Sequence, residues 1–364
     1  MHIYYFALDI TIKGGTEGIT VSLANLFVEK GHEVSIVSFF KSNPEIGSKL
    51  DERVKVIYLN EKAYPLEKGY VARFKSFVEC FRKLRRLTKS SLRPVKGNVY
   101  IGQNFFPNML LWLVGLGKYA IGCEHFKYDI YPAPIAAIRN YVYARFGRIV
   151  TLTDVDANKF KKHIGRNRVA TIPNMVTVKA DFELDINSKT IIAVGRLQPQ
   201  KGFDFLIEAM RTVIEKHNDW ILNIWGIGDL HDELQNQIDD LNLQQHVFLK
   251  GFTRDIVSEY AKSSFFVLSS RYEGFPLALI EALSLGIPSV AFNCPSGCAE
   301  LLANGGGILV EKENVAKLAD AIIYMIEHPR YRLECSKHKE QIRKELSPDV
   351  IYEKWYRLFL CMNK

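Results

Sequence analysis

The chain has 364 residues, of which 48% are hydrophobic and 24% are charged, and it carries a formal net charge of +8 at pH 7. This length suits two domains, and the composition is that of a soluble globular protein. No apolar run reaches the roughly 18 residues of a membrane span. The first ten residues, MHIYYFALDI, lack the basic leader of a signal peptide. The positive charge indicates an anionic partner: nucleic acid, a phosphorylated metabolite or an anionic membrane surface.

The cysteines indicate neither a metal site nor disulfides. None of the six belongs to a CxxC pair, and the closest two, Cys294 and Cys298, have a spacing unlike any zinc signature. Reduced thiols are therefore expected at Cys80, Cys123, Cys294, Cys298, Cys335 and Cys361.

Short apolar runs alternate with helix-length segments along the whole chain. In the first half, strands are predicted at 3–8, 34–38, 54–59, 99–103, 120–124, 149–153 and 169–172. In the second half, they are predicted at 190–194, 221–225, 247–250, 265–269, 289–292 and 307–310. These runs are nearly continuous in Val, Ile and Phe, which suits strands buried on both faces of a parallel sheet. The alternation predicts an α/β protein with two doubly wound domains.

A glycine-rich turn follows the first predicted strand, in DITIKGGTEGITVSLANLF. Gly14, Gly15 and Gly18 precede a helix, whose Leu23, Leu26 and Phe27 are predicted to share one face. Glycines let backbone N–H groups approach a phosphate, and a helix N-terminus adds positive potential. The spacing is neither GxGxxG nor GxxxxGK[ST], so a purely structural turn explains it almost as well.

The segment 68–97 is strongly basic, with ten Lys and Arg against one acid, Glu79. An apolar stripe at helical spacing is predicted from Val71, Phe74, Val78, Phe81 and Leu84. Such a helix lies in an anionic membrane interface or packs on its own domain as a solvated surface helix. The one-sided charge favours the membrane. Nucleic acid is not favoured, because the polar face lacks interleaved stacking aromatics.

The polar stretch 174–189 has no helical periodicity and is the predicted break between domains. We therefore expect an N-terminal domain over 1–175 and a C-terminal domain over 185–345. The last segment, 346–364, is predicted to form a terminal helix that crosses back to the first domain. Its apolar stripe is formed by Ile351, Trp355 and Leu358.

The second domain opens with TIIAVGRLQPQKGFDFLIEAM. Arg196 follows the strand that ends near Gly195, and Lys201 precedes the next helix. Both cations are thus predicted at the carboxyl edge of a parallel sheet, where doubly wound domains bind their ligands. Together they could neutralise a diphosphate, although two surface cations in a loop are the simpler alternative.

The stretch SSRYEGFPLALIEAL, at 269–283, carries two acids around a turn. Glu273 is predicted in the loop before a helix that has Pro276 in its first turn, and Glu281 lies about 7.5 Å further along the helix. This separation is long for two carboxylates that share one metal or one proton. It suits two ends of an extended ligand.

These motifs resemble the donor site of retaining glycosyltransferases of family four. The resemblance rests on GRLQPQKG and EGFPLALIE, and on the ordered series GGTEG, GHEVSIVS, EHF, TLTDVDANKF, IPN and NCPSGCAELL. It covers nearly the whole chain and implies the GT-B fold, which is two Rossmann-like domains with the active site in the cleft between them. Three positions depart from the family pattern. Gly18 stands where close relatives often carry Arg, which puts one phosphate or acceptor contact in doubt. Cys298 and the run Gly305–Gly307 also differ, but neither change touches the core donor residues.

The resemblance also implies roles for individual residues. In such enzymes two cations stabilise the leaving diphosphate without a metal or cofactor, one acid contacts the sugar and another holds the ribose. Retention is explained there by attack on the face from which the diphosphate departs, so no protein nucleophile is required. Carried over, the catalytic residues are Arg196, Lys201, Glu273 and His125. The donor-binding residues are Gly15, Gly195, Arg196, Lys201, Glu273, Gly274, Phe275, Leu277 and Glu281.

The resemblance implies transfer of a hexose or N-acetylhexosamine from a nucleoside diphosphate sugar, most often of uridine. The acceptor would be a growing bacterial surface polysaccharide such as lipopolysaccharide, capsule or O-antigen, carried on a lipid diphosphate. A cytoplasmic enzyme, peripheral on the inner face of the membrane through 68–97 and without a nucleic-acid partner, is expected. A nucleotide-sugar epimerase of the same fold and a catalytically silent nucleotide-sugar-binding protein are the alternatives.

Overall fold

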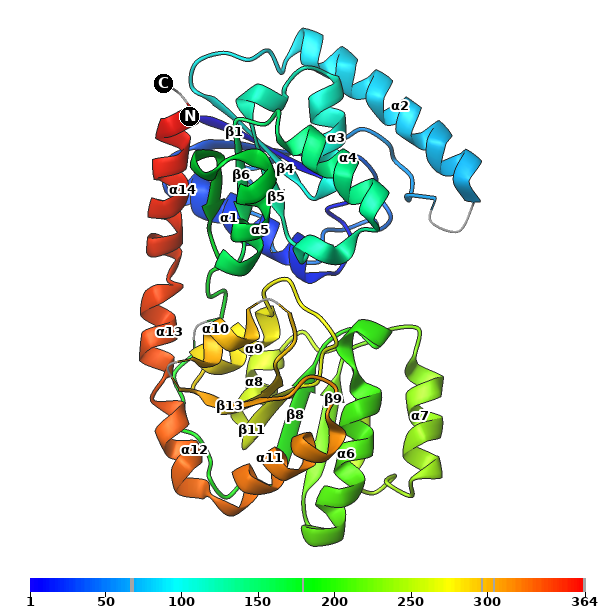
Figure 1. The fold of residues 1–364 in the computed structure, drawn as a ribbon, viewed down its shortest axis with the longest axis vertical. Helices are drawn as coiled ribbons and strands as arrows, with labels where there is room; N and C mark the ends of the chain where they lie inside the picture. Colours follow the sequence, from blue (N-terminus) through cyan, green and yellow to red (C-terminus); the bar gives the residue numbers. More distant parts are fainter. Residues whose placement is uncertain (66–68, 179, 296, 304, 363–364) are drawn as a thin grey trace. The chain divides into compact units, whose positions relative to one another are not determined.

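The computed structural model describes residues 1–65, 69–178, 180–295, 297–303 and 305–362 of the chain. They form two compact units (Figure 1). Unit 1 comprises Met1–Met175 and Pro348–Lys364, and unit 2 comprises Val176–Ser347. The division at 175/176 falls inside the polar stretch 174–189, and the terminal helix belongs to unit 1.

Unit 1 is a seven-stranded parallel sheet in the order β3-β2-β1-β4-β5-β6-β7. Its strands are β1 His2–Ala7, β2 Glu33–Ser38, β3 Lys55–Tyr58, β4 Asn98–Gln103, β5 Ala120–Glu124, β6 Arg148–Thr151 and β7 Val169–Thr171. Its helices are α1 Gly15–Glu29, α2 Gly69–Ser90, α3 Phe105–Leu113, α4 Ala133–Tyr143, α5 Asp154–Ile164 and α14 Pro348–Met362, with short 3₁₀ turns at η1 Gly117–Tyr119, η2 Tyr128–Ile130 and η3 Arg166–Arg168.

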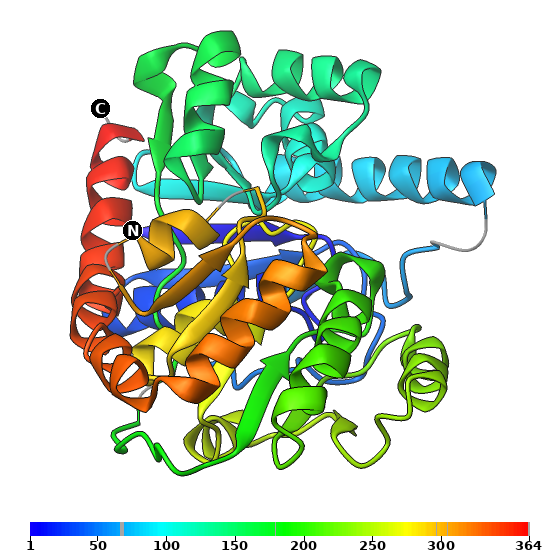
Figure 2. The same cartoon turned by 60° about the horizontal axis from the view of Figure 1, so that its bottom comes forward.

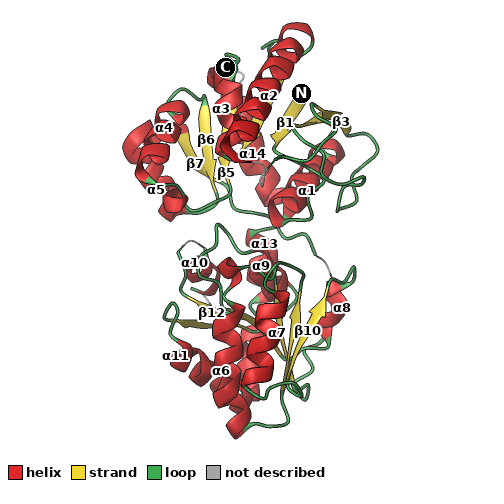
Figure 3. Ribbon diagram, turned by 90° about the vertical axis from the view of Figure 1, so that its right-hand side faces the viewer, coloured by secondary structure: helices red, strands yellow, loops and turns green. Residues whose placement is uncertain are grey.

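Unit 2 is a six-stranded parallel sheet in the order β10-β9-β8-β11-β12-β13. Its strands are β8 Thr190–Val194, β9 Ile221–Trp225, β10 Val247–Gly251, β11 Phe265–Leu268, β12 Ser289–Phe292 and β13 Gly307–Val310. Its helices are η4 Pro199–Lys201, α6 Phe203–Lys216, α7 His231–Asp240, α8 Ile256–Ala261, α9 Leu277–Ser284, α10 Cys298–Leu302, α11 Val315–Glu327, α12 Pro329–Ser336 and α13 Lys339–Glu345. Figure 3 shows the strands of each unit lying between helices.

Each sheet reverses its strand order at one place, and ligands of doubly wound domains bind outside the carboxyl ends of the strands there. In unit 1 the reversal lies between β1 and β4. In unit 2 it lies between β8 and β11. The predicted strands are all present, and the α/β prediction is confirmed because both sheets are parallel and lie between helices. Central strands such as β1 and β11 are buried along nearly their whole length, whereas the edge strands β3, β10 and β13 are partly exposed.

The terminal helix packs on unit 1 through the predicted stripe. Ile351, Trp355 and Leu358 are buried, and the Trp355 and Phe359 rings lie 6.2 and 5.4 Å from the ring of Phe27 in α1, in edge-to-face geometry. Edge-to-face aromatic pairs of this kind add to the stabilisation that burial provides. The face predicted for α1 is buried as well.

The apolar stripe predicted for α2 is only half buried, which corrects the prediction of one continuous face. Leu84 and the nearby Cys80 are fully buried in the core of unit 1, whereas Val71 and Phe74 remain 70% and 68% exposed. Figures 1 and 2 show why: the Gly69 end of α2 projects beyond α3 and α4. The apolar side chains of the first turns, Tyr70, Val71 and Phe74, are therefore largely exposed.

Candidate active site

The loop after β8 carries the two predicted cations at the carboxyl edge of the unit 2 sheet. Arg196 follows Gly195 directly, and Lys201 closes the 3₁₀ turn η4. The next residue, Gly202, has φ 61°, and a Cβ atom there would lie 2.1 Å from the carbonyl oxygen of Ser269. Only glycine permits this approach, so the β8 loop packs directly against the end of β11.

Lys201 is ion-paired with one of the predicted acids. Its Nζ lies 2.7 Å from Oε1 of Glu273, and the hydroxyl of Ser270 donates to the same oxygen at 2.6 Å. Both charged side chains are largely buried, with 17% and 8% of their surface exposed. The two side chains of a buried ion pair depend on each other, because removing one leaves the other as an uncompensated buried charge. The sequence predicted both residues in the site but not this contact.

Glu281 lies on α9, close enough to Lys201 for the cation to act on it. Burial raises the pKa of Glu281 to about 7, and the charge of Lys201 opposes this rise. The helix begins at Leu277, because Pro276 has extended backbone (ψ 102°) and occupies the N-cap position. The prediction that Pro276 lies in the first turn was therefore wrong by one residue.

Gly274, Phe275 and Leu277 form the turn into α9, whose first N–H groups have no partner within the helix. Phe275 is buried, and a Cβ atom on Gly297 would lie 2.9 Å from its ring. The loop after β12 thus packs on this turn. The sulfurs of Cys294, in this loop, and Cys298, at the start of α10, lie 3.4 Å apart as free thiols.

Arg196 differs from Lys201 in its surroundings. It is exposed, and no ion pair or hydrogen bond joins its side chain to the described residues. A guanidinium held at a sheet edge without a carboxylate partner is available to an anion from solvent. Arg196 and the start of α9 therefore place positive potential where β8 and β11 end, and Lys201 lies at the same edge in its pair with Glu273.

Two glycines that shape this edge were missed in the sequence. Gly226 and Gly228 follow β9 in WGIGDL, and a Cβ atom on either would lie within 2.3 Å of the backbone of the β8 loop, at Gly195 and Leu197. They let the loop after β9 pack closely against the β8 loop, on the side of β8 away from β11. The signal that could have found them is a GxG directly after a predicted strand.

The remaining predicted residues, Gly15 and His125, lie in unit 1. Gly15 is the first residue of α1, after the extended N-cap Gly14, and neither has a positive φ. His125 follows β5, and its backbone N–H donates to Oδ1 of Asn104 at 3.0 Å. Its Nε2 is buried without a hydrogen-bond partner among the described residues, and burial lowers the pKa of this imidazole to about 4. A neutral ring with an unpartnered nitrogen is a candidate ligand contact.

Other features of the described residues do not add to the site. No group of three or more His, Cys, Asp and Glu within them is arranged to hold a metal ion, and none of their helices is long and apolar enough to cross a membrane. Two hollows in unit 1, of about 430 and 580 Å³, are lined by α2 and by the η2, α4 and α5 region, not by predicted site residues.

Comparison with known proteins identifies the family of this chain. Residues 13–179 match the model of Glycosyltransferase Family 4, and residues 177–342 match that of Glycosyl transferases group 1. An uncharacterized glycosyltransferase of Haemophilus influenzae is 29% identical, over 97% of this chain and 98% of that protein. A poly(ribitol-phosphate) alpha-N-acetylglucosaminyltransferase of Staphylococcus aureus is 27% identical, over 94% of this chain and 77% of its own length.

A third relative covers less of the chain. It is a UDP-Gal:alpha-D-GlcNAc-diphosphoundecaprenol alpha-1,3-galactosyltransferase of Escherichia coli, 31% identical over 43% of this chain and 44% of that protein. Among solved structures, a mutant of Staphylococcus aureus TarM with fondaparinux, alpha-GlcNAc-glycerol and UDP superposes with a TM-score of 0.83. It is 19% identical, and the match covers 98% of this chain and 99% of that one. The chain belongs to the group 1 glycosyltransferases of family 4, and its two parallel sheets have the GT-B fold.

Proposed function

We propose that this protein is a retaining glycosyltransferase that moves a hexose or N-acetylhexosamine from a UDP-sugar to a growing, lipid-linked bacterial polysaccharide. The observation that carries the proposal is the pairing of Lys201 with Glu273 beside the unpaired Arg196, at the β8/β11 switch point. Two cations and a helix start fit a diphosphate, and the adjoining carboxylate fits sugar hydroxyls.

The chemistry follows from these groups. When the bond between the sugar and the diphosphate breaks, negative charge develops on the leaving UDP, and preorganised cations stabilise it best. Arg196 would bind phosphate oxygens in a fork, while Lys201 acts as a point charge. Glu273 would orient the sugar, and Glu281 would accept hydrogen bonds from the ribose hydroxyls. A phosphate oxygen of the departing UDP would take the acceptor's proton as the acceptor attacks from the same face.

The substrate class is supported by the relatives. The Staphylococcus aureus and Escherichia coli relatives are named as an N-acetylglucosaminyl and a galactosyltransferase, and the latter's name specifies a UDP donor and a diphosphoundecaprenol-linked acceptor. The related TarM structure contains UDP. Applied to this chain, these names indicate UDP-hexose or UDP-N-acetylhexosamine as the donor and a lipid-diphosphate-linked saccharide as the acceptor.

A donor panel tests the proposed function. Purified protein with UDP-glucose, UDP-galactose and their N-acetyl forms is expected to release UDP from one donor, faster with membrane extract that contains lipid-linked acceptor. The anomeric proton coupling of the product should be that of the donor. Conversion of the nucleotide sugar to its epimer without release of UDP would identify an epimerase. Binding without turnover on every donor would identify a silent protein.

The lipid-linked acceptor requires the enzyme to work at a membrane surface, and we propose that α2 provides the contact at the inner face of the cytoplasmic membrane. Tyr70, Val71 and Phe74 are exposed at its projecting end. The following turns expose Arg82, Arg85, Arg86 and Lys89. Exposed apolar side chains can enter the lipid interface, and each basic residue adds about 1 kcal/mol near an anionic leaflet.

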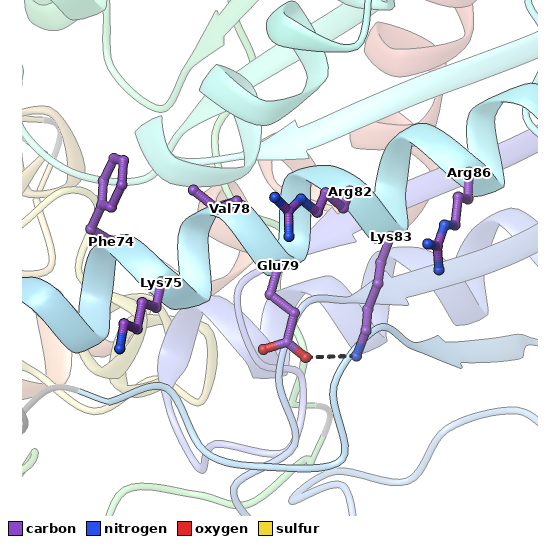
Figure 4. A pocket seen from close by; sticks show the side chains of 7 residues that line it. All are labelled: Phe74, Lys75, Val78, Glu79, Arg82, Lys83 and Arg86. Atoms are coloured by element: carbon purple, nitrogen blue, oxygen red, sulfur yellow. Dashed lines mark ion pairs between the residues drawn. The ribbon is translucent and has the colours of Figure 1, made fainter.

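Figure 4 distinguishes the free cations of α2 from one that is structural. The shallow groove drawn there is lined by Phe74, Lys75, Val78, Glu79, Arg82, Lys83 and Arg86. Lys83 pairs with Glu79 at 2.9 Å and donates to the carbonyl oxygen of Leu59 and to Oδ1 of Asn60. Lys83 therefore anchors α2 to the end of β3, and it should be left intact when membrane binding is tested.

Replacing Arg82, Arg85, Arg86 and Lys89 by glutamine is expected to weaken binding to liposomes with anionic lipid about a thousandfold, because roughly 4 kcal/mol of electrostatic attraction is lost. Co-sedimentation measures this. The matched control removes four exposed cations of unit 2, Lys216, Arg330, Lys337 and Lys344. Equal loss in both variants, or undiminished binding by the α2 variant, would contradict the proposed contact.

A further inference from the structure

Asn104 has an unusual backbone conformation at the switch point of unit 1. It directly follows β4, beside β1, with φ 61° and ψ 177°. This region of backbone space is essentially confined to glycine, because a Cβ atom is crowded there. A side chain that is kept in spite of the strain indicates that the side chain itself is needed.

Two hydrogen bonds hold Asn104 between β4 and β5. Its backbone N–H donates to the carbonyl oxygen of Cys123 at 2.7 Å, and its side-chain Oδ1 accepts from the backbone N–H of His125 at 3.0 Å. Its own carbonyl oxygen accepts the first bond of α3, from Asn108 at 3.3 Å. The position therefore links the ends of two strands to the start of a helix. A glycine could make the two backbone contacts without strain, but not the contact with His125.

In the described part of unit 1, the residue that Asn104 holds has an unpartnered polar atom at the sheet edge, as does the neighbouring Glu124 at the end of β5 through its Oε1. Nε2 of His125 is buried and has no hydrogen-bond partner among the described residues. A buried polar group costs stability unless a partner is supplied, here by something that the chain does not contain. This observation is independent of the backbone strain and points to the same place.

We infer that Asn104 is a positioning residue, whose carboxamide fixes the main chain of His125 so that the imidazole meets the substrates in a single orientation. The inference rests on the proposed function, because it assigns His125 to the sugar-transfer site. The backbone strain at Asn104 is tolerated because its side-chain oxygen accepts the hydrogen bond from His125, which glycine could not do.

Three substitutions separate positioning from folding. In Asn104→Gly the strain and the carboxamide both disappear, so the denaturation midpoint should stay or rise while kcat falls about a hundredfold, the order expected for a misplaced catalytic contact. In Asn104→Ala the strain remains, so the midpoint should fall along with kcat. In Asn104→Asp the acceptor oxygen is kept, and kcat should stay within about threefold of wild type. The donor KM should change little in all three.

Asn242 provides the matched control, because it also has a positive φ, of 55°, but lies after α7 in unit 2. Asn242→Gly should leave kcat unchanged. Asn104→Gly with nearly normal kcat, or Asn104→Asp as impaired as Asn104→Ala, would overturn the inference.

A readout that needs no activity distinguishes this inference from the proposed function. The His125 imidazole, assigned by comparison with His125→Asn, can be titrated by NMR on histidine-labelled protein. Its wild-type midpoint should lie near 4 because of burial, and release from Asn104 in the Gly and Ala variants should move it toward 6.5. An unchanged midpoint in both variants overturns the inference. If wild type transfers no sugar although the midpoint moves, the proposed function fails while Asn104 still holds His125.

Discussion

Replacing Lys201 by alanine is expected to lower kcat for sugar transfer by about 10²–10³-fold, the loss typical of removing one preorganised electrostatic contact to developing charge. Replacing Arg196 by alanine should have an effect of the same order. UDP release from the preferred donor measures both. The two variants should differ in stability, because Lys201 neutralises the buried Glu273, whereas Arg196 is exposed and unpaired with any described residue.

Lys201→Ala leaves Glu273 buried without its cation. Removing one partner of a buried ion pair lowers the free energy of unfolding by about 3 kcal/mol or more. A loss of activity could then reflect a damaged fold. The double variant Lys201→Ala, Glu273→Gln removes both charges and keeps an oxygen that can accept from Ser270. It should recover stability but not turnover.

The control for these variants is Lys262→Ala, which removes an exposed lysine paired with Glu259 in the same unit. Exposed pairs contribute little, so activity and stability should both stay close to wild type. The assignment of Arg196 and Lys201 to the donor diphosphate is wrong if either alanine variant turns over normally. It is also wrong if the double variant regains activity together with stability.

The strands of both sheets were predictable because each strand has a local pattern in the sequence. Strands buried on both faces appear as continuous apolar runs, and every predicted strand is present with ends within two residues of those in the structure. Helix faces were less predictable. Periodicity identifies which residues of α2 share a face, but not how far the rest of unit 1 extends along it, so Leu84 is buried and Phe74 is not.

The site was predictable in its residue types and not in its contacts. Lys201 and Glu273 are far apart in sequence, and they meet because β8 and β11 are neighbours in the sheet, which no local pattern specifies. Asn104 was not identified at all, since its strain is a property of the folded backbone. The glycines after β9 were overlooked although GxG after a strand is a local signal, because their need for glycine comes from the β8 loop that packs against them.

Glu281→Gln is expected to stabilise unit 2 at pH 8 while it weakens UDP binding. The carboxyl group has a pKa of about 7 in the fold, against an ordinary value of 4.5, because burial disfavours its charged form. Glutamine has nearly the same shape and no charge to bury. If the carboxylate accepts the ribose hydroxyls, its loss should raise the Kd of UDP about tenfold or more, the usual worth of hydrogen bonds to a charged group.

The sign of the pH dependence follows from the direction of the shift. Below pH 4.5 the carboxyl is protonated in both folded and unfolded protein, so glutamic acid and glutamine should be equally stable there. Between pH 4.5 and about 7 the folded protein keeps a proton that the unfolded chain has lost, so wild-type stability falls as pH rises. Above pH 7 the wild-type free energy of unfolding lies below that of Glu281→Gln by a constant amount, roughly 3 kcal/mol.

Hydrogen exchange of peptides from α9 in urea measures this difference in unit 2 directly, and isothermal titration with UDP measures the affinity. The exposed Glu334 on α12 serves as the control, since Glu334→Gln should change stability by less than about 0.5 kcal/mol at every pH. If Glu281→Gln were stabilised equally at every pH, the raised pKa of Glu281 could not be the cause of the gain. A gain at high pH with unchanged UDP affinity would mean that Glu281 is a buried acid of α9 without a role in holding the ribose.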